Sequence, residues 1–261
     1  MKNYGFREEL VKIEPEAWIR LGGAGETVRP DGVWPLVLYE PQALTFETCA
    51  CTCFGMTTQV EMYLKERYGF EPNYSERYHY NDVGISCPGA NPQDVYQSAH
   101  RNGLIGQEEL SMTDTLEEYK TPRPLTETLI RKGQKWPYEL THWWLSDTSK
   151  ESLIEQLKYC PIGASVTAWY EEDGVYVDKG QSNNHWVVIF SPADYKGRKT
   201  VKVFDSYDHS VKILHPDHRI SFAKAISITP VSENEQQEII GGIIDFFVKV
   251  WTRILKALFN R

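Results

Sequence analysis

The stretch Thr48-Cys49-Ala50-Cys51-Thr52-Cys53-Phe54-Gly55 holds three of the five cysteines in the chain. From Cys53 onward, apolar side chains recur at steps of three and four residues as far as Tyr68, which is the period of an amphipathic helix. Thr48 is a candidate N-cap for this helix, and Gly69 stands where a left-handed C-cap would end it. We therefore predict a helix that begins at the cysteine cluster.

One interpretation of the cluster is a zinc or iron–sulfur site. Its ligands would be Cys49, Cys51, Cys53 and the distant Cys87. Structural metal sites usually separate paired ligands by two to four residues, whereas single residues separate these cysteines, and no pair with metal-like spacing follows downstream. Cys51 and Cys53 would also point to different sides of a helix. The spacing of the cysteines therefore argues against a metal site, and we expect no cofactor.

The other interpretation makes Cys51 a nucleophile in the first turn of the helix. Backbone N–H groups and the positive end of the helix dipole stabilise a thiolate at that position. Cys53 begins the apolar stripe, and we expect both Cys53 and Cys160 to be buried core thiols. A nucleophilic cysteine also needs a general base to take its proton.

His185 is the candidate base, and Asp205 is its predicted partner. Residues 184–190 and 200–206 alternate as strands do, and an antiparallel hairpin would join them. A hairpin centred on Tyr195 would pair Ile189 with Val201, Val187 with Val203, and His185 with Asp205. A carboxylate beside an imidazole fixes its tautomer and stabilises its protonated form. His209, close to Asp205 in sequence, is a rival base, and the other histidines are predicted to be surface or structural residues.

Helices are predicted before Cys160 and strands after it. Shorter helices are expected within residues 92–110 and 124–135, and Asp147-Thr148-Ser149 offers caps for a helix through Lys158. The apolar period then falls to two, and several strands follow. Helices first and an antiparallel sheet afterwards is the α+β pattern, with two unlike lobes.

Composition and charge exclude several classes of protein. The 261 residues carry a net charge of −8, so a nucleic-acid partner is not expected, because nucleic-acid binders need a basic surface. The N-terminal residues lack the apolar core of a signal peptide, and no window is apolar enough for a transmembrane helix. An odd number of cysteines favours a reducing compartment, so we predict a cytoplasmic protein.

Residues 238–261 differ from the rest of the chain and predict a C-terminal amphipathic helix. Its narrow polar stripe consists of Asp245, Lys249, Thr252, Arg253, Lys256 and Asn260. Such a helix packs on its own body or a second copy, lies on a membrane surface as a peripheral contact, or docks on a partner. The sequence leaves these alternatives open.

These features resemble the papain-like cysteine peptidases, in divergent form, over roughly residues 42–206. The run from Cys51 to Gly55 resembles the start of that family's active-site helix, and Cys87-Pro88-Gly89-Ala90-Asn91-Pro92 is similar to its segment beside the substrate. Asn184-His185-Trp186-Val187-Val188 resembles its catalytic histidine strand. Phe204-Asp205-Ser206-Tyr207 stands where the family has its asparagine and tryptophan.

The resemblance implies a papain-like two-lobe fold with the active-site cleft between a helical lobe and an antiparallel β-sheet or barrel lobe. The catalytic domain would span residues 42–237, with a helical lobe at about 42–125 and a β lobe at about 155–232. Residues 1–41 would be an N-terminal lead-in, too short for the family's long inhibitory propeptide.

The resemblance also implies the site residues: catalytic Cys51, His185, Asp205 and Gln42, and substrate-binding Gly89 and Ala90. Gln42 would help to form the oxyanion hole, although its gap to Cys51 is longer than usual. Asp205 replaces the family's asparagine, and Tyr207 replaces the tryptophan that covers the pair. Because Thr48 stands where the family has a disulfide cysteine, whether the neighbouring Cys49 pairs with Cys87 stays open.

We therefore predict a thiol protease that cleaves peptide bonds of a peptide or protein substrate through a thioester acyl-enzyme. Two alternatives share the fold. One is an amidohydrolase or acyltransferase of a related papain-like clan, acting for example on peptidoglycan or a leader peptide. The other is a papain-like binding protein without catalysis.

Overall fold

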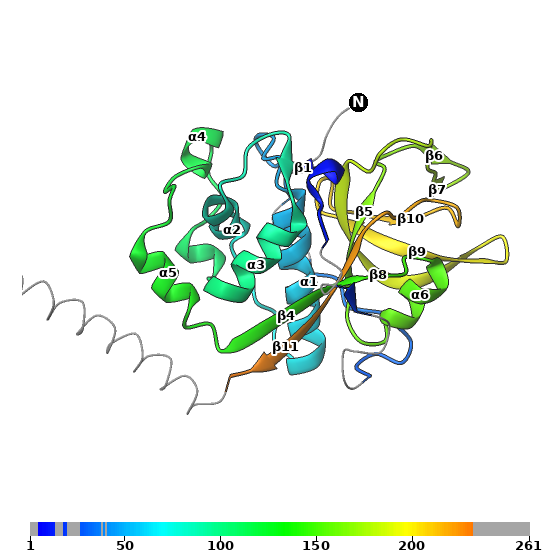
Figure 1. Ribbon diagram of the computed structural model, residues 1–261, viewed down its shortest axis with the longest axis horizontal. Helices are drawn as coiled ribbons and strands as arrows, with labels where there is room; N and C mark the ends of the chain where they lie inside the picture. The colour runs from blue at the N-terminus through cyan, green and yellow to red at the C-terminus, as the bar shows by residue number, and fades with distance from the viewer. Residues whose placement is uncertain (1–4, 14–17, 20–26, 38, 40, 232–261) are drawn as a thin grey trace, which may run out of the picture.

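Helices α1 to α5 gather on one side of the molecule, and most of the main sheet lies on the other (Figure 1). The computed structural model describes residues 5–13, 18–19, 27–37, 39 and 41–231. The helices are α1 (Cys51–Tyr68), α2 (Glu76–Val83), α3 (Pro92–Asn102), α4 (Leu116–Tyr119), α5 (Glu127–Gly133) and α6 (Lys150–Gln156), with 3₁₀ turns η1 (Glu8–Leu10) and η3 (Gln107–Glu109). The arrangement is the predicted α+β class with two unlike lobes.

The main sheet has seven strands in the order β10-β9-β8-β5-β11-β4-β2. Its strands are β2 (Trp18–Ile19), β4 (Tyr138–Leu145), β5 (Ile162–Val166), β8 (His185–Tyr195), β9 (Arg198–Asp205), β10 (Ser210–Ile213) and β11 (Ala223–Pro230). All neighbours are antiparallel except β2 and β4. Two smaller pairs are β1 (Gly5–Phe6) with β3 (Gly89–Ala90), and β6 (Glu171–Glu172) with β7 (Val175–Tyr176).

Helix α1 lies between the helices and the sheet, where it packs against α2 and α3 as well as β8 (Figure 1). It begins at Cys51 as predicted, but Ala50 is its N-cap, and the Thr48 hydroxyl instead accepts a hydrogen bond from the Ala50 N–H at 3.3 Å. Gly69 ends the helix in the left-handed conformation, with φ of 73°, which confirms the predicted C-cap. Its position holds Cys51 at the boundary between the lobes.

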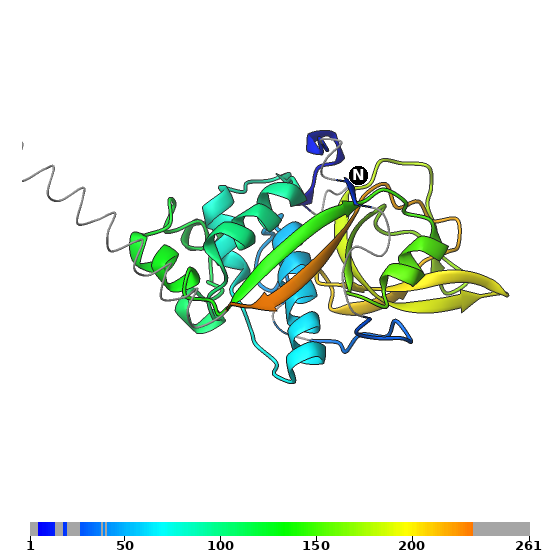
Figure 2. The ribbon, with the colours of Figure 1, turned by 60° about the horizontal axis from the view of Figure 1, so that its bottom comes forward.

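The other predicted helices are present, and helices α2 and α4 and strands β1 to β4 are additions. Helix α3 lies within the predicted range 92–110, α5 within 124–135, and the Ser149 side chain caps α6. Strand β4 was not expected, because its burial does not alternate cleanly: three consecutive buried residues end it. It pairs with β11, and the two strands run side by side across the front of α1 in the view of Figure 2.

The predicted helix at 238–261 lies outside the described residues, so its contacts stay predictions. Within the part of the chain that the structure describes, no helix is both long and apolar enough to span a bilayer.

Candidate active site

Cys51 is the first residue of α1 and is fully buried. The first N–H groups of an α-helix have no acceptor within the helix, so they form a positive pole around the cysteine. The next N–H groups are engaged: those of Cys53 and Phe54 both donate to the Ala50 carbonyl, at 2.8 and 3.1 Å. Cys53 and Cys160 are buried thiols, as predicted from the sequence.

His185 begins β8 and Asp205 ends β9, and both side chains are buried. The His185 Nε2 lies 2.6 Å from the Asp205 Oδ1. His209, the rival base, instead packs its ring on Phe204, with the ring centroids 5.6 Å apart. The structure therefore brings His185, and not His209, to the carboxylate.

The predicted hairpin register is wrong, although the predicted pair forms. The turn is Lys196-Gly197, with Tyr195 paired with Arg198, and both turn residues have positive φ, at 53° and 78°. The hairpin is therefore centred beyond Tyr195. The observed ladder pairs Val188 with Phe204, Ile189 with Val203, and Ser191 with Lys202.

The Asp205 carboxylate accepts four hydrogen bonds, two on each oxygen. Oδ1 accepts from His185 and from the Tyr207 N–H at 2.9 Å, and Oδ2 accepts from the Trp169 indole N–H at 2.7 Å and the Lys212 ammonium at 2.9 Å. Burial alone would raise the pKa of Asp205, but the charges and hydrogen bonds of His185 and Lys212 outweigh it and hold that pKa well below its usual value. Asp205 is therefore a carboxylate at neutral pH.

Two of these partners were not anticipated from the sequence. The Trp169 ring stands edge-on to the His185 ring, with centroids 5.8 Å apart, while the Tyr207 ring lies 6.5 Å from it. Trp169, which follows β5, thus contacts both members of the His185–Asp205 pair. Lys212 lies in β10, and nothing in the sequence indicated that it would contact Asp205, because charged residues in strands usually face water.

Cys51 adjoins the β8 end of the pair, since its sulfur receives a backbone hydrogen bond from Trp186, next to His185. Burial raises the pKa of Cys51 well above its usual value, the Trp186 hydrogen bond lowers it, and the charges of Asp205 and Glu47 add to the rise. The position at the helix N-terminus predicts a stabilised thiolate, whereas the burial of Cys51 favours the neutral thiol.

Gly55 allows the close approach of α1 and β8. A Cβ atom at Gly55 would lie 2.7 Å from the Cδ1 of Trp186, and a Cβ at Gly163 of β5 would meet both Trp186 and the Tyr96 hydroxyl. Trp186 is fully buried between these two glycines. The packing of α1, which begins at Cys51, against β8, which begins at His185, therefore depends on two positions without side chains.

Gln42 is buried near the end of β9, where its backbone N–H donates to the Ser206 carbonyl at 2.9 Å. Its side-chain amide donates to the Glu47 carboxylate at 3.5 Å. Glu47 also accepts from the Cys49 N–H at 2.9 Å and from the Tyr207 hydroxyl at 2.8 Å. Glu47 is a further residue of this region that sequence reasoning missed.

Cys49 and Cys87 form a disulfide, which settles the pairing that the sequence left open. The bond ties the residue two before Cys51 to the residue two before Gly89. Disulfides form and persist in oxidising environments, so the odd number of cysteines no longer supports a reducing compartment. No group of three or more metal-binding side chains occurs in the described ranges.

Residues 5–10 of the chain itself lie along the predicted substrate segment (Figure 1). Gly5 pairs with Gly89 and Phe6 with Ala90 in a parallel ladder, and Phe6 is fully buried. Its ring centroid lies 5.6 Å from that of Trp186. The predicted N-terminal lead-in therefore contains a strand that contacts both lobes.

Further contacts hold the same segment. The Asn183 N–H donates to the Glu8 carboxylate at 2.7 Å, and the Asn91 side chain donates to the Leu10 carbonyl at 3.3 Å. Gly5 also passes so close to the Cys49 carbonyl that a Cβ atom there would clash with it. The segment is thus held beside Cys49, two residues before Cys51, and against Gly89 and Ala90 of the predicted substrate segment.

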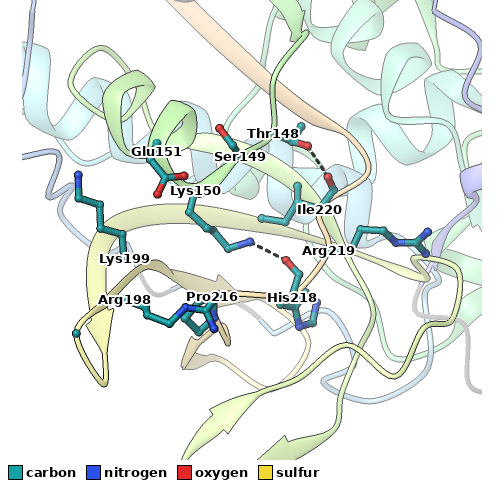
Figure 3. A pocket seen from close by; sticks show the side chains of 11 residues that line it. Thr148, Ser149, Lys150, Glu151, Arg198, Lys199, Pro216, His218, Arg219 and Ile220 are labelled. Atoms are coloured by element: carbon teal, nitrogen blue, oxygen red, sulfur yellow. Dashed lines mark hydrogen bonds between the residues drawn. The ribbon is translucent and has the colours of Figure 1, made fainter.

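A pocket of about 710 Å³ lies elsewhere, around the start of α6 (Figure 3). Its buried Lys150 donates to the His218 carbonyl at 2.6 Å, and burial lowers the pKa of Lys150 to about 8. Arg198, also on its wall, is paired with Asp217 at 2.9 Å. The predicted site residues do not line this pocket, so we treat it as separate from the candidate active site.

No protein-family model matches the sequence, and no curated protein does. Solved structures do match. The proform of Amb a 11, a ragweed pollen cysteine protease, is 15% identical with a TM-score of 0.60, over 80% of this chain and 69% of that one. Bromelain from Ananas comosus, in complex with the E64 inhibitor, is 17% identical with a TM-score of 0.59, over 74% and 94%.

Procathepsin L 3 from the larval midgut of Tenebrio molitor is 14% identical with a TM-score of 0.58, over 78% of this chain and 76% of that one. At these identities the likeness defines the fold. The chain has the two-lobe fold of the papain-like cysteine peptidases, as the sequence resemblance implied.

Proposed function

We propose that the protein is a thiol hydrolase that cleaves peptide bonds through Cys51, His185 and Asp205. The observation that carries this proposal is the 2.6 Å hydrogen bond between His185 and Asp205 beside the first turn of α1, where Cys51 lies. A cysteine at a helix N-terminus, an imidazole and an orienting carboxylate are the groups that nucleophilic catalysis by a thiol requires.

The first step is proton transfer within the site. Because Asp205 holds a proton on the Nε2 of His185, the Nδ1 is the nitrogen that takes the thiol proton of Cys51. The resulting thiolate attacks the carbonyl carbon of the scissile peptide bond, and a tetrahedral oxyanion forms. The backbone N–H of Cys51 and the side chain of Gln42 would donate to it, and each such donor contributes about 3 kcal/mol in comparable hydrolases.

The later steps return the proton. His185 protonates the leaving amine as the C–N bond breaks, which leaves a thioester on Cys51. Water then gives a proton to His185 and attacks the thioester, which releases the acid and restores the thiol. Asp205 stabilises the imidazolium in both halves of the reaction.

A peptide substrate is favoured over the alternatives by one contact. Gly89 and Ala90 already hold an extended peptide, Gly5–Phe6, as an added strand. This supports recognition of a peptide backbone, whereas cell-wall or acyl-transfer chemistry would not need it. A non-catalytic binding protein would be expected to lack a member of the site, and Cys51, His185 and Asp205 are all present.

Substrate and the segment 5–6 would compete for the same backbone groups of Gly89 and Ala90. We therefore expect low basal activity, which rises when the segment leaves.

The test combines a peptide-epoxide probe with a proteolysis assay. Intact-mass and peptide mapping should find one adduct on Cys51, and casein or peptide hydrolysis should be lost in Cys51→Ala but retained in Cys160→Ala. Adduct formation on Cys51→Ala would assign the nucleophile elsewhere. Adduct formation without proteolysis, together with digestion of peptidoglycan, would favour the amidohydrolase alternative.

A further inference from the structure

Lys212 lies in β10 with its side chain only 2% exposed. Its Nζ lies 2.9 Å from the Asp205 Oδ2 and 2.6 Å from the Asp208 Oδ1, and it donates to the Ser210 hydroxyl. The ammonium also lies 5.0 Å from the centroid of the Trp169 ring, in cation–π range. Lys212 therefore contacts the carboxylate that orients His185, on the oxygen that His185 does not use.

A buried lysine is a costly way to fill this position. Desolvation of an ammonium and a carboxylate often exceeds their attraction, so a neutral pair would fold at least as well. An asparagine in place of Asp205 could still accept a hydrogen bond from His185 without any compensating cation. The chain instead has two opposite charges behind the imidazole, which points to a role for the charges themselves.

We propose that Lys212 is a positioning residue of the Cys51–His185–Asp205 site, whose charge offsets that of Asp205 and so sets the pH range of the thiolate–imidazolium pair. This inference rests on the proposed thiol hydrolase function. Lys212 touches neither substrate nor reacting atoms, and it acts through Asp205.

The sign of the effect follows from the charges around His185. Asp205 favours the imidazolium, and the positive charge of Lys212 behind it weakens that effect. Lys212 also favours the thiolate, which the surrounding acidic groups oppose. Asp205 on β9 and Glu47 before α1 act on Cys51 in this way. The other acidic groups are Asp208 before β10, which is paired with Lys212, and Glu8, which accepts from the Asn183 N–H.

Loss of the lysine charge would therefore stabilise the imidazolium and destabilise the thiolate. The pH profile of Cys51 reactivity has an acid limb, where the thiolate–imidazolium pair forms, and an alkaline limb, where the imidazolium loses its proton. Both changes move these limbs to higher pH. The charges of Lys212 and His185, with the Asp205 carboxylate between them in a buried site, interact strongly enough to move each limb by about one pH unit.

The experiment measures the rate at which iodoacetamide alkylates Cys51 between pH 5 and 10, by intact mass and peptide mapping of the full chain. Lys212→Met should shift both limbs upward by about one pH unit, whereas Lys212→Arg keeps the charge and should keep the wild-type limbs. Lys224→Met is the matched control, because Lys224 is also fully buried but donates to Gln93 and lies over Trp144. Its limbs should not move.

A second pair of variants separates charge from structure. Asp205→Asn alone leaves the lysine charge facing His185, so its alkaline limb should fall by about one pH unit or more. The double variant Asp205→Asn/Lys212→Met removes both charges and should return that limb towards its wild-type position. A double variant that recovers in this way folds, whatever the stability of the single ones.

The outcomes distinguish this inference from the proposed function. Equal limbs in wild type and Lys212→Met, with the rate lowered by the same factor at every pH, would mean a structural role and overturn the inference alone. A single alkaline rise with no plateau, both in wild type and in a Gly5→Val variant that cannot pair residues 5–6 with Gly89 and Ala90, would overturn the proposed function and the inference with it.

Discussion

The His185 Nε2 lies 2.6 Å from the Asp205 Oδ1, yet the two residues are not opposite each other in the β8–β9 ladder. Near the turn, Ser191 pairs with Lys202. The register then shifts between Ser191 and Ile189, and Ile189 pairs with Val203. One extra residue of β8 is therefore taken up between them.

That extra residue, Phe190, decides which face Asp205 occupies. Side chains alternate along a strand, so an uninterrupted register from the turn would place Asp205 on the face opposite to His185. After the bulge, the ladder continues so that Asp205 shares the face of Val187 and thus of His185. The hydrogen bond of the candidate site is therefore made possible by a β-bulge.

Replacement of Asp205 by asparagine tests the electrostatics of this pair through stability. At pH 7, Asp205→Asn should lower the free energy of unfolding by about 3 kcal/mol, because the buried Lys212 loses the buried one of its two carboxylate partners. The pKa of Asp205 is lower in the folded protein than in the unfolded chain, so its contribution is complete above about pH 4 and is lost as pH falls through the folded value. Urea denaturation from pH 7 to pH 2 should show a constant difference that narrows below about pH 4.

The control is Asp217→Asn, which removes an exposed partner of Arg198 and should change stability little. A difference between wild type and Asp205→Asn that persists unchanged to pH 2 would contradict the electrostatic account.

The sequence predicted the correct pair from an incorrect register, and the reason is physical. At the open end of the hairpin, Ile189 pairs with Val203 and not with Val201, so the true register differs from the predicted one by two residues. A shift of two residues keeps each side chain on the same face of the sheet. Diagonal neighbours on one face are still within reach of long side chains. The turn dipeptide Lys196-Gly197 was the missed signal, since lysine seldom takes a positive φ.

What the sequence could not predict arises from contacts between distant segments. Helices α1, α3, α5 and α6 and most strands after Cys160 have local periodicities or caps, so they were predictable, whereas α2, α4 and the strands before Cys160 were not predicted. Trp169 and Lys212 reach Asp205 from other strands, and Gly5 reaches Gly89 across much of the chain. No local pattern encodes these pairings, and a short segment of mixed polarity such as residues 5–10 has no period to reveal it.

Displacement of residues 5–10 should activate the protein. Gly5 has φ of 113° and passes against the Cys49 carbonyl, so Gly5→Val should force the segment away from Gly89. The burial of Phe6 contributes about 2 kcal/mol to the closed arrangement, so loss of this contact should raise the open population at least tenfold. Initial rates of peptide hydrolysis and of Cys51 alkylation should rise together.

Glu9→Ala is the matched control, because this exposed side chain in the same segment is bonded only locally, to Arg7. Rates that fall in Gly5→Val while those of Glu9→Ala are unchanged would show that the segment supports the site instead of blocking it.

Removal of the disulfide should affect stability and substrate binding. Its loop of 38 residues predicts that Cys87→Ser lowers the free energy of unfolding by about 4 kcal/mol in the chain-entropy account. KM should rise more than kcat falls, since the bond anchors Gly89 beside Cys51 but contacts no reacting atom. Urea denaturation and hydrolysis assays of Cys87→Ser and Cys49→Ser should agree, because each variant loses the same bond, and disagreement would assign a separate role to one cysteine.

Gln42 offers the sharpest test of the proposed oxyanion hole, because its side chain has a competing contact. The amide donates to Glu47 at 3.5 Å, which is a long hydrogen bond that a developing oxyanion could replace. Gln42→Ala should therefore lower kcat by about 100-fold while KM changes little, since the interaction would form only in the transition state. Cys51 alkylation by iodoacetamide, which forms no oxyanion, should proceed at the wild-type rate in this variant. A matching loss of alkylation would show instead that Gln42 acts on the thiol, through Glu47 and the loop before α1.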